Sequence, residues 1–210
     1  MDLNWLFEAT NCRVVSDSRM DCLTGPGSGR AHLWEMKVGG RSSNRFNAQS
    51  SYAPPVVVDF ASPDVRINDF ATSGNDTIVI TGRKFGPVSQ EGKWSSMIDI
   101  IGISTWERGD DFTQFNSSDC FVSEPHTAIT CKVSEGVGDS LKWDVIVDEQ
   151  LSVIMTTSYG SPQIRRFMAT KGGSHVVESD SGSISGLSTM GGEIVDIEGI
   201  HFGPCTTMGS

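Results

Sequence analysis

The side chains with the clearest chemistry in this chain are its five cysteines. Four of them form two local pairs, Cys12 with Cys22 and Cys120 with Cys131. Spacings of this length, with no histidine in a matching place beside them, predict disulfide bonds rather than a metal site. Buried free thiols are the alternative, because cysteine is also a small apolar residue. Cys205 has no later cysteine to pair with, so its partner stays open. Disulfides form in oxidising compartments, and the pairs therefore indicate an extracellular or cell-surface protein.

Two asparagines carry the acceptor pattern for N-linked glycans. Asn75 begins the triplet Asn-Asp-Thr, and Asn116 begins the triplet Asn-Ser-Ser. Such triplets are common by chance, but glycans at both sites would agree with the compartment that the cysteines indicate. The sequence thus predicts a disulfide-bonded extracellular glycoprotein.

A group of acidic residues offers oxygen ligands of the kind that Ca²⁺ prefers: Glu107, Asp110, Asp111 and Asp119. A solvated loop that keeps an acidic protein soluble is the simpler interpretation, so we predict no metal and no cofactor. The four histidines fall at unrelated positions, and the chain has no Gly-x-Ser-x-Gly element of a hydrolase. We therefore predict no catalytic residue and a protein that is not an enzyme.

The formal net charge of the chain is -10 at pH 7. This charge repels nucleic acids and anionic lipids, so we expect no nucleic-acid partner. No apolar run approaches the roughly 18 residues that a membrane-spanning helix needs, and we expect no membrane insertion within this chain. The first residues lack the basic and apolar stretches of a signal peptide, and we expect the parent protein to begin elsewhere.

The elements that must position these side chains recur along the chain, and the step from Pro55 to Pro162 gives a period of 107 residues. Cys22 precedes Trp34 by 12 residues, and Cys131 precedes Trp143 by the same 12. In each copy a Gly-x-Gly element begins five residues after the second cysteine. Self-similarity at a fixed period defines the structural unit before any strand is assigned.

A second recurring element, Gly-x-x-Phe-Gly-Pro, begins at Gly82 and again at Gly199. Between the preceding phenylalanine and this element, the later copy is ten residues longer, and we read the Gly/Ser-rich stretch 172–191 as a surface-loop insertion. The two elements together predict the C-terminal half of one repeat at 1–53, a complete repeat at 54–161 and the N-terminal half of a third at 162–210.

Apolar and polar residues alternate in the best-defined segments of the complete unit, Thr77–Gly82 and Leu141–Asp148. A period of two predicts strands with one face buried, and each Phe-Gly-Pro element predicts a turn with an apolar plug. The expected core residues are Trp34, Trp143, Phe85, Phe202, Ile78, Ile80, Val145 and Val147.

About seven short strands, separated by Gly, Pro, Asn and Asp, fit in the complete unit, and no helical period persists. Residues 107–119 are acidic and polar and are expected to form a loop. This pattern predicts an all-β fold made of immunoglobulin-like β-sandwich repeats in tandem. Because almost no linker separates the units, neighbouring sandwiches should abut and form a stiff rod.

These motifs, in this order, resemble an IPT/TIG domain, an immunoglobulin-like module of the E-set type. The resemblance covers essentially the whole chain and rests on the unit-opening proline, Gly-x-x-Phe-Gly-Pro, the paired cysteines, Gly-x-Gly and Gln150-Leu151-Ser152 before Tyr159. The first copy has Arg41 in place of the glutamine. Similar tandem arrays occur in plexin-like receptors, fibrocystin-like proteins and large surface proteins of protists and algae. The resemblance implies an extracellular, non-enzymatic scaffold or binding module, with unidentified protein or cell-surface ligands and neighbouring repeats as its partners.

We therefore expect a fragment of a rod-like array used for adhesion, spacing or receptor-type protein binding. Two alternatives stay open, an accessory β-sandwich module of a carbohydrate-active enzyme and the dimerisation sandwich of a DNA-binding factor. The acidity and the paired cysteines count against the second. We also expect the isolated chain to complete its half units by strand exchange between molecules, because 1–53 and 162–210 each lack strands that the other supplies.

Overall fold

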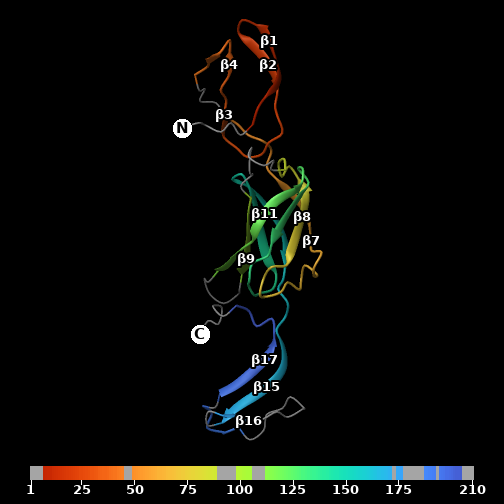
Figure 1. Cartoon of the computed structure of the whole chain (residues 1–210), viewed down its shortest axis with the longest axis vertical. Coiled ribbons are helices and arrows are strands. Elements are labelled where there is room, and N and C mark those ends of the chain that lie inside the picture. Colours follow the sequence, from red (N-terminus) through yellow and green to blue (C-terminus); the bar gives the residue numbers. More distant parts are fainter. Residues whose placement is uncertain are drawn as a thin grey trace.

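The computed structural model describes residues 7–44, 49–88, 98–105, 112–171, 174–176, 187–192 and 194–204. Every regular element in these ranges is a β-strand, and the strands form three groups one after another along the long axis of the molecule (Figure 1). The predicted all-β class is therefore confirmed. Cys205 and three of the four acidic residues predicted to form a loop, Glu107, Asp110 and Asp111, lie outside the described residues.

The central group contains two four-stranded antiparallel sheets. The first has the strand order β11 (Ser118–Glu124), β12 (Ala128–Lys132), β8 (Thr77–Arg83), β7 (Val56–Ala61). The second has the strand order β10 (Phe112–Asn116), β9 (Ile98–Thr105), β13 (Leu141–Val147), β14 (Gln150–Thr157). The structure thus has a strand at β10, where the polar composition of residues 107–119 predicted only loop.

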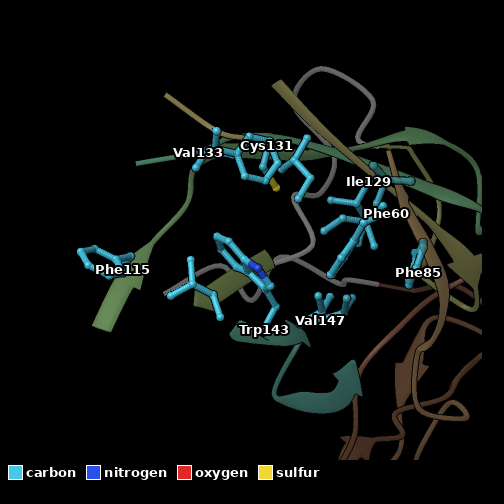
Figure 2. Close-up of a cluster of buried hydrophobic side chains, with 14 of the residues drawn as sticks. Phe60, Phe85, Phe115, Ile129, Cys131, Val133, Trp143 and Val147 are labelled. Carbon is cyan, nitrogen blue, oxygen red and sulfur yellow. The ribbon is translucent and has the colours of Figure 1, made fainter. Parts of the chain in front are cut away.

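The two sheets enclose one hydrophobic core, because their strands alternate buried and accessible residues as a half-buried strand must. On β13, Leu141, Trp143, Val145 and Val147 are buried, whereas Lys142 is exposed and Asp144 and Ile146 are half-buried. On β8, the buried positions are Ile78 and Ile80. Side chains from both sheets and from the connecting loops meet in the cluster of Figure 2.

Phe85 closes one part of this core from the segment that follows β8 and is fully buried. A methyl group on Gly82 would collide with the Phe85 ring and with the Val56 carbonyl, so this position requires glycine. The Gly-x-x-Phe-Gly-Pro element is therefore a packing motif, in which the glycine makes room for the phenylalanine three residues later.

The N-terminal group consists of short antiparallel pairs. They are β1 (Thr10–Ser16) with β2 (Arg19–Leu23), β3 (His32–Leu33) with β6 (Gln49–Ser50), and β4 (Lys37–Val38) with β5 (Arg41–Ser42). The C-terminal group is a three-stranded sheet in the order β16 (Ser174–Val176), β15 (Gln163–Lys171), β17 (Ile194–Ile200). β16 falls inside the stretch 172–191 that was predicted to be a surface-loop insertion.

Two of the predicted core residues are not buried. Trp34 is 44% exposed and Phe202 is 43% exposed, whereas their counterparts Trp143 and Phe85 are both 0% exposed. The prediction is wrong for Trp34 and Phe202, because the described residues of the outer groups form only two-stranded pairs and one three-stranded sheet instead of the two four-stranded sheets that enclose the central core. Alternation along a strand identifies the inward face but does not show whether anything packs on it.

Candidate functional site

Left-handed backbone conformations recur at the aligned positions of the sequence repeat. Among the described residues with positive φ, every one except His126 has a counterpart of positive φ one repeat away. The pairs are Asn11 with Asp119, Gly29 with Gly138, Ala31 with Ser140, Gly39 with Asp148, Gly40 with Glu149, Gly74 with Gly191, Asn75 with Gly192, Lys84 with His201, and Gly86 with Gly203. Non-glycine residues adopt this conformation at a cost, so the pairing marks positions where the chain path is tightly constrained.

Each of the two Gly-x-Gly loops is held by the tyrosine near the end of its segment. The Tyr159 hydroxyl donates to the Ser134 carbonyl at 2.9 Å, and the Tyr159 backbone N–H donates to the Gly138 carbonyl at 2.9 Å. In the N-terminal segment the Tyr52 hydroxyl donates to the Gly25 carbonyl at 2.8 Å. The Tyr52 backbone N–H donates to the Gly29 carbonyl at 2.9 Å. The two tyrosines thus make equivalent bonds at aligned positions.

The first glycine of each loop makes room for the tyrosine ring. A Cβ added at Gly136 would lie 2.6 Å from the Tyr159 hydroxyl oxygen, and one added at Gly27 would lie 2.6 Å from the ring of Tyr52. Neither position tolerates a larger residue without moving the tyrosine. Burial of the ring raises the pKa of Tyr159 to about 12, because the charged phenolate is poorly solvated there.

A junction joins the N-terminal segment to the turn between β13 and β14. The Ser28 hydroxyl donates to the Asp148 carboxylate, and the Arg30 Nε lies 3.5 Å from the Glu149 carboxylate. A Cβ added at Gly29 would lie 2.9 Å from the Cβ of Asp148. The turn therefore sits directly against the loop that the tyrosine of the N-terminal segment holds.

Gln150 completes this junction from the first position of β14. Its side-chain Nε2 donates to the Tyr52 carbonyl at 2.9 Å, across a sequence separation of 98 residues. Two positions later in the same motif, the Ser152 hydroxyl accepts the backbone N–H of Val57 at 3.2 Å. The Gln-Leu-Ser element thus holds the chain at two points, at Tyr52 shortly before β7 begins and at Val57 within β7.

A second junction joins the central segment to the C-terminal one. The His201 ring and the Asp69 carboxylate both approach Gly160, because a Cβ added there would lie 2.7 Å from the ring and 2.9 Å from a carboxylate oxygen. Gly160 also donates its backbone N–H to the Phe70 carbonyl at 2.8 Å. Glycine at this position lets the histidine of the third segment pack on the backbone of the second.

Both predicted cysteine pairs are bonded. The Cys12–Cys22 disulfide joins β1 to β2 with a Cα–Cα distance of 4.1 Å, and Cys120–Cys131 joins β11 to β12 with a Cα–Cα distance of 4.2 Å. Cys131 is buried against the core, whereas Cys12 is exposed. Two intramolecular disulfides are typical of an oxidising environment.

The two predicted glycan acceptors lie at exposed positions. Asn75 occupies the tight turn before β8, with its backbone N–H donating to the Val133 carbonyl at 2.8 Å. Its own carbonyl accepts the Lys132 Nζ at 3.1 Å. Asn116 ends β10, at the edge of the second sheet. Exposure in a turn gives a glycosyltransferase access to the Asn75 side chain.

Of the four acidic residues weighed as a Ca²⁺ site, only Asp119 lies in the described ranges, at positive φ beside Cys120. The described part of the chain contains no group of three or more His, Cys, Asp or Glu residues arranged to hold a metal ion. The Asp139 carboxylate accepts hydrogen bonds from the Ser158 hydroxyl and from the Ser140 backbone N–H, and these bonds lower the pKa of Asp139. They also fix the chain beside Tyr159. The polar contacts described here therefore hold loops and junctions together.

Comparisons with known proteins supply no relative. No protein-family model matches the chain, and neither the curated proteins nor the solved structures give a significant match. Within the described ranges, no helix has the length and apolarity that crossing a membrane requires.

The sequence identified the cysteines, Tyr159 and Gln150 of this arrangement but missed the junction contacts of Ser28, Arg30, Asp148 and Glu149. Those four residues differ from their counterparts in the other copies, so the repeat gives no signal for them. One difference between the copies could have indicated a contact: the first copy has Gly39-Gly40 in its turn, whereas the second has the charged pair Asp148-Glu149.

Proposed function

We propose that this chain is a non-enzymatic, extracellular spacer and binding module, built from tandem immunoglobulin-like β-sandwich repeats of the IPT/TIG type. The observation that carries the proposal is the junction at Gln150, which ties the central segment to the carbonyl of Tyr52 in the segment before it. A module fixed in this way transmits orientation and force to its neighbour, as a rod requires.

The repeat interpretation is supported by contacts that recur in detail. The indole N–H of Trp143 donates to the Thr157 hydroxyl at 2.6 Å, and that of Trp34 donates to the Ser50 hydroxyl at 2.8 Å, at aligned positions. The two loops held by tyrosines, and the two hairpins closed by disulfides, also lie at aligned positions of the two segments. Strand order and register in the central segment agree with one complete immunoglobulin-like unit.

The extracellular setting is supported by the two disulfides and by the exposure of Asn75 and Asn116. In such a setting the unit would present loops and sheet faces to protein ligands, while the packing motifs that recur along the chain hold neighbouring segments in a fixed orientation. Expression through a eukaryotic secretory pathway should add a glycan at each asparagine. The Asn75→Gln and Asn116→Gln variants should each remove one glycan mass from the intact protein.

The experiment that tests the spacer function measures whether residues 7–53 and 54–161 move together. We expect residual dipolar couplings from both segments to fit one alignment tensor, and ¹⁵N relaxation to give both one tumbling time. In the Gln150→Ala variant, which loses the bond to Tyr52, the tensors should diverge. Lys142→Ala, at an exposed position of β13, is the matched control and should leave the shared tensor unchanged. Independent tensors in the unmodified protein would overturn the proposal.

A further inference from the structure

The second junction, where the C-terminal segment meets the central one, brings a histidine and a carboxylate to the same glycine. A Cβ added at Gly160 would lie 2.8 Å from Nδ1 of the His201 ring and 2.9 Å from Oδ1 of Asp69. His201 belongs to the turn that follows β17, and Asp69 belongs to the loop between β7 and β8. Two side chains from different segments therefore meet at one residue of the linker between them.

The loop that carries Asp69 is fixed to this linker. The Phe70 backbone N–H donates to the Ser158 carbonyl at 3.2 Å, and the Phe70 carbonyl accepts the Gly160 N–H at 2.8 Å. The Phe70 side chain is fully buried and packs edge-to-face on the ring of Tyr159. Asp69 thus has a set place on the central segment, and its contact with the third segment changes when that segment turns.

We propose that the second junction is a pH-sensitive hinge, which docks the C-terminal segment more firmly on the central one when His201 is protonated. Histidine ordinarily gains its proton between about pH 5 and pH 8, a range in which carboxylates keep their charge. Protonated His201 is attracted to the Asp69 carboxylate, and neutral His201 is not. The contact stabilises the docked orientation on the acidic side of this range and is lost as the pH rises through it. The inference rests on the proposed rod and gives it a regulation.

The other ionisable groups on the elements around His201 leave this attraction in place. On the loop between β7 and β8, the Asp64 carboxylate accepts the Thr77 N–H and the Asp76 carboxylate accepts the Ala71 N–H. On the linker, Tyr159 stays neutral in this range, because burial raises its pKa to about 12. In the sheet of His201, the Arg166 guanidinium binds the Glu198 carboxylate. Two further cations, Arg66 and Arg165, are exposed, and water and salt screen their charges.

The aligned residue of the central segment shows that this position accepts a permanent cation. Lys84 follows β8 as His201 follows β17, and both residues adopt the left-handed conformation, with φ of 68° at Lys84 and 61° at His201. Lysine keeps its charge throughout the range in which histidine titrates. The repeat therefore has a constant charge at one of these positions and a titratable one at the other, and it supplies a substitution that the backbone tolerates.

Residual dipolar couplings measured on the full chain at about pH 5.5 and about pH 8 test the hinge. The alignment magnitude of β15 and β17, divided by that of residues 54–161, approaches one as the C-terminal segment docks. We expect the ratio of docked to undocked orientations to be up to about fivefold higher at the lower pH, the upper end for an ion pair at a partly exposed site. The Asp69→Asn variant should lose this difference.

Two substitutions at His201 separate its charge from its packing. His201→Lys should dock firmly at both pH values, whereas His201→Asn, which also accepts a positive φ, should stay at the level of the neutral histidine at both. Chemical shifts of β15 and β17 verify that the sheet stays folded. His175→Gln is the matched control, because His175 pairs with Thr170 at the end of β15 away from the linker, and it should keep the full pH response.

Equal alignment ratios at the two pH values in the unmodified protein would contradict the hinge, and so would a pH response that survives in His201→Asn. Neither result bears on the first junction, where Gln150 binds the Tyr52 carbonyl. A shared tensor for residues 7–53 and 54–161 would then still support the rod, so the failure of the hinge is distinguishable from the failure of the rod.

Discussion

Trp143 and Trp34 make the same kind of hydrogen bond at aligned positions, but only Trp143 is buried. A comparison of the two therefore separates the stability that comes from burial of the side chain from the stability that comes from its hydrogen bond. The Trp143 indole donates to Thr157, and both residues are 0% exposed. The Trp34 indole donates to Ser50, but Trp34 is 44% exposed. Replacement of each tryptophan by phenylalanine removes the same donor and the same ring atoms from two different environments.

The cost at Trp143 has two parts. Phenylalanine buries roughly 50 Å² less apolar surface than tryptophan, which corresponds to about 1.3 kcal/mol at ~25 cal/mol per Å². The Thr157 hydroxyl, left buried without its donor, costs about 1–3 kcal/mol more. Trp143→Phe should therefore lower the free energy of unfolding of the central segment by about 3 kcal/mol. Trp34→Phe should cost under about 1 kcal/mol, because water can replace the lost donor at Ser50.

Urea denaturation followed by far-UV circular dichroism measures both costs. Hydrogen exchange of peptides from β12–β14 assigns the transition to the central segment, and dilute protein avoids any contribution from association. Adding Thr157→Val to Trp143→Phe removes the orphaned hydroxyl and should recover about 1–2 kcal/mol. Equal costs for Trp143→Phe and Trp34→Phe, or no recovery in the double variant, would refute the reasoning from burial.

Three further changes test the loop, the disulfide and the junction. Because burial raises the pKa of Tyr159 to about 12, a 295 nm titration should show a phenolate step near that pH that Tyr159→Phe abolishes. Since the folded pKa exceeds the unfolded value, the stability from this tyrosine is complete below pH 10 and falls as the pH rises toward 12. Replacing Cys120 and Cys131 with alanine opens a loop of separation 11 and should lower the free energy of unfolding by about 3 kcal/mol in urea. Asp148→Gly should stabilise the central segment by up to about 1 kcal/mol while broadening the distribution of spin-label distances between residues 7–53 and 54–161. An unchanged distribution would mean that the Ser28 contact does not hold the junction.

Much of the central fold follows from the sequence, because its strands alternate clearly. β8 and β13 lie where the pattern of Ile78, Ile80, Trp143, Val145 and Val147 predicts them. β10 was missed, because its five residues Phe-Thr-Gln-Phe-Asn follow an acidic stretch and contain too few apolar positions to establish a period. Antiparallel pairing with β9, the strand before it in the sequence, makes it a strand, and the composition of the five residues alone does not indicate that pairing.

The junctions could not be predicted, for a different reason. A repeat reveals what its copies share, such as the two tyrosines and the glycines that make room for them. Ser28, Arg30, Asp148 and Glu149 contact each other across the junction, and each differs from its counterpart. A contact between two copies joins two different surfaces, so its residues differ from copy to copy. The residues that pack inside each copy face the same surroundings every time and therefore recur. The exposure of Trp34 and Phe202 is likewise a property of neighbours rather than of local sequence.

The turn between β13 and β14 shows how stability and junction contacts compete. Two residues connect these strands, and both have positive φ, 44° at Asp148 and 64° at Glu149, as a type I′ hairpin turn requires. The aligned turn in the first segment uses Gly39 and Gly40, which adopt positive φ at little cost. In the central segment the glycines are replaced by two carboxylates at strained positions, and these carboxylates bind Ser28 and Arg30 of the preceding segment. Since glycine would serve the hairpin better, the side chains of Asp148 and Glu149 are explained by the contacts that they make across the junction.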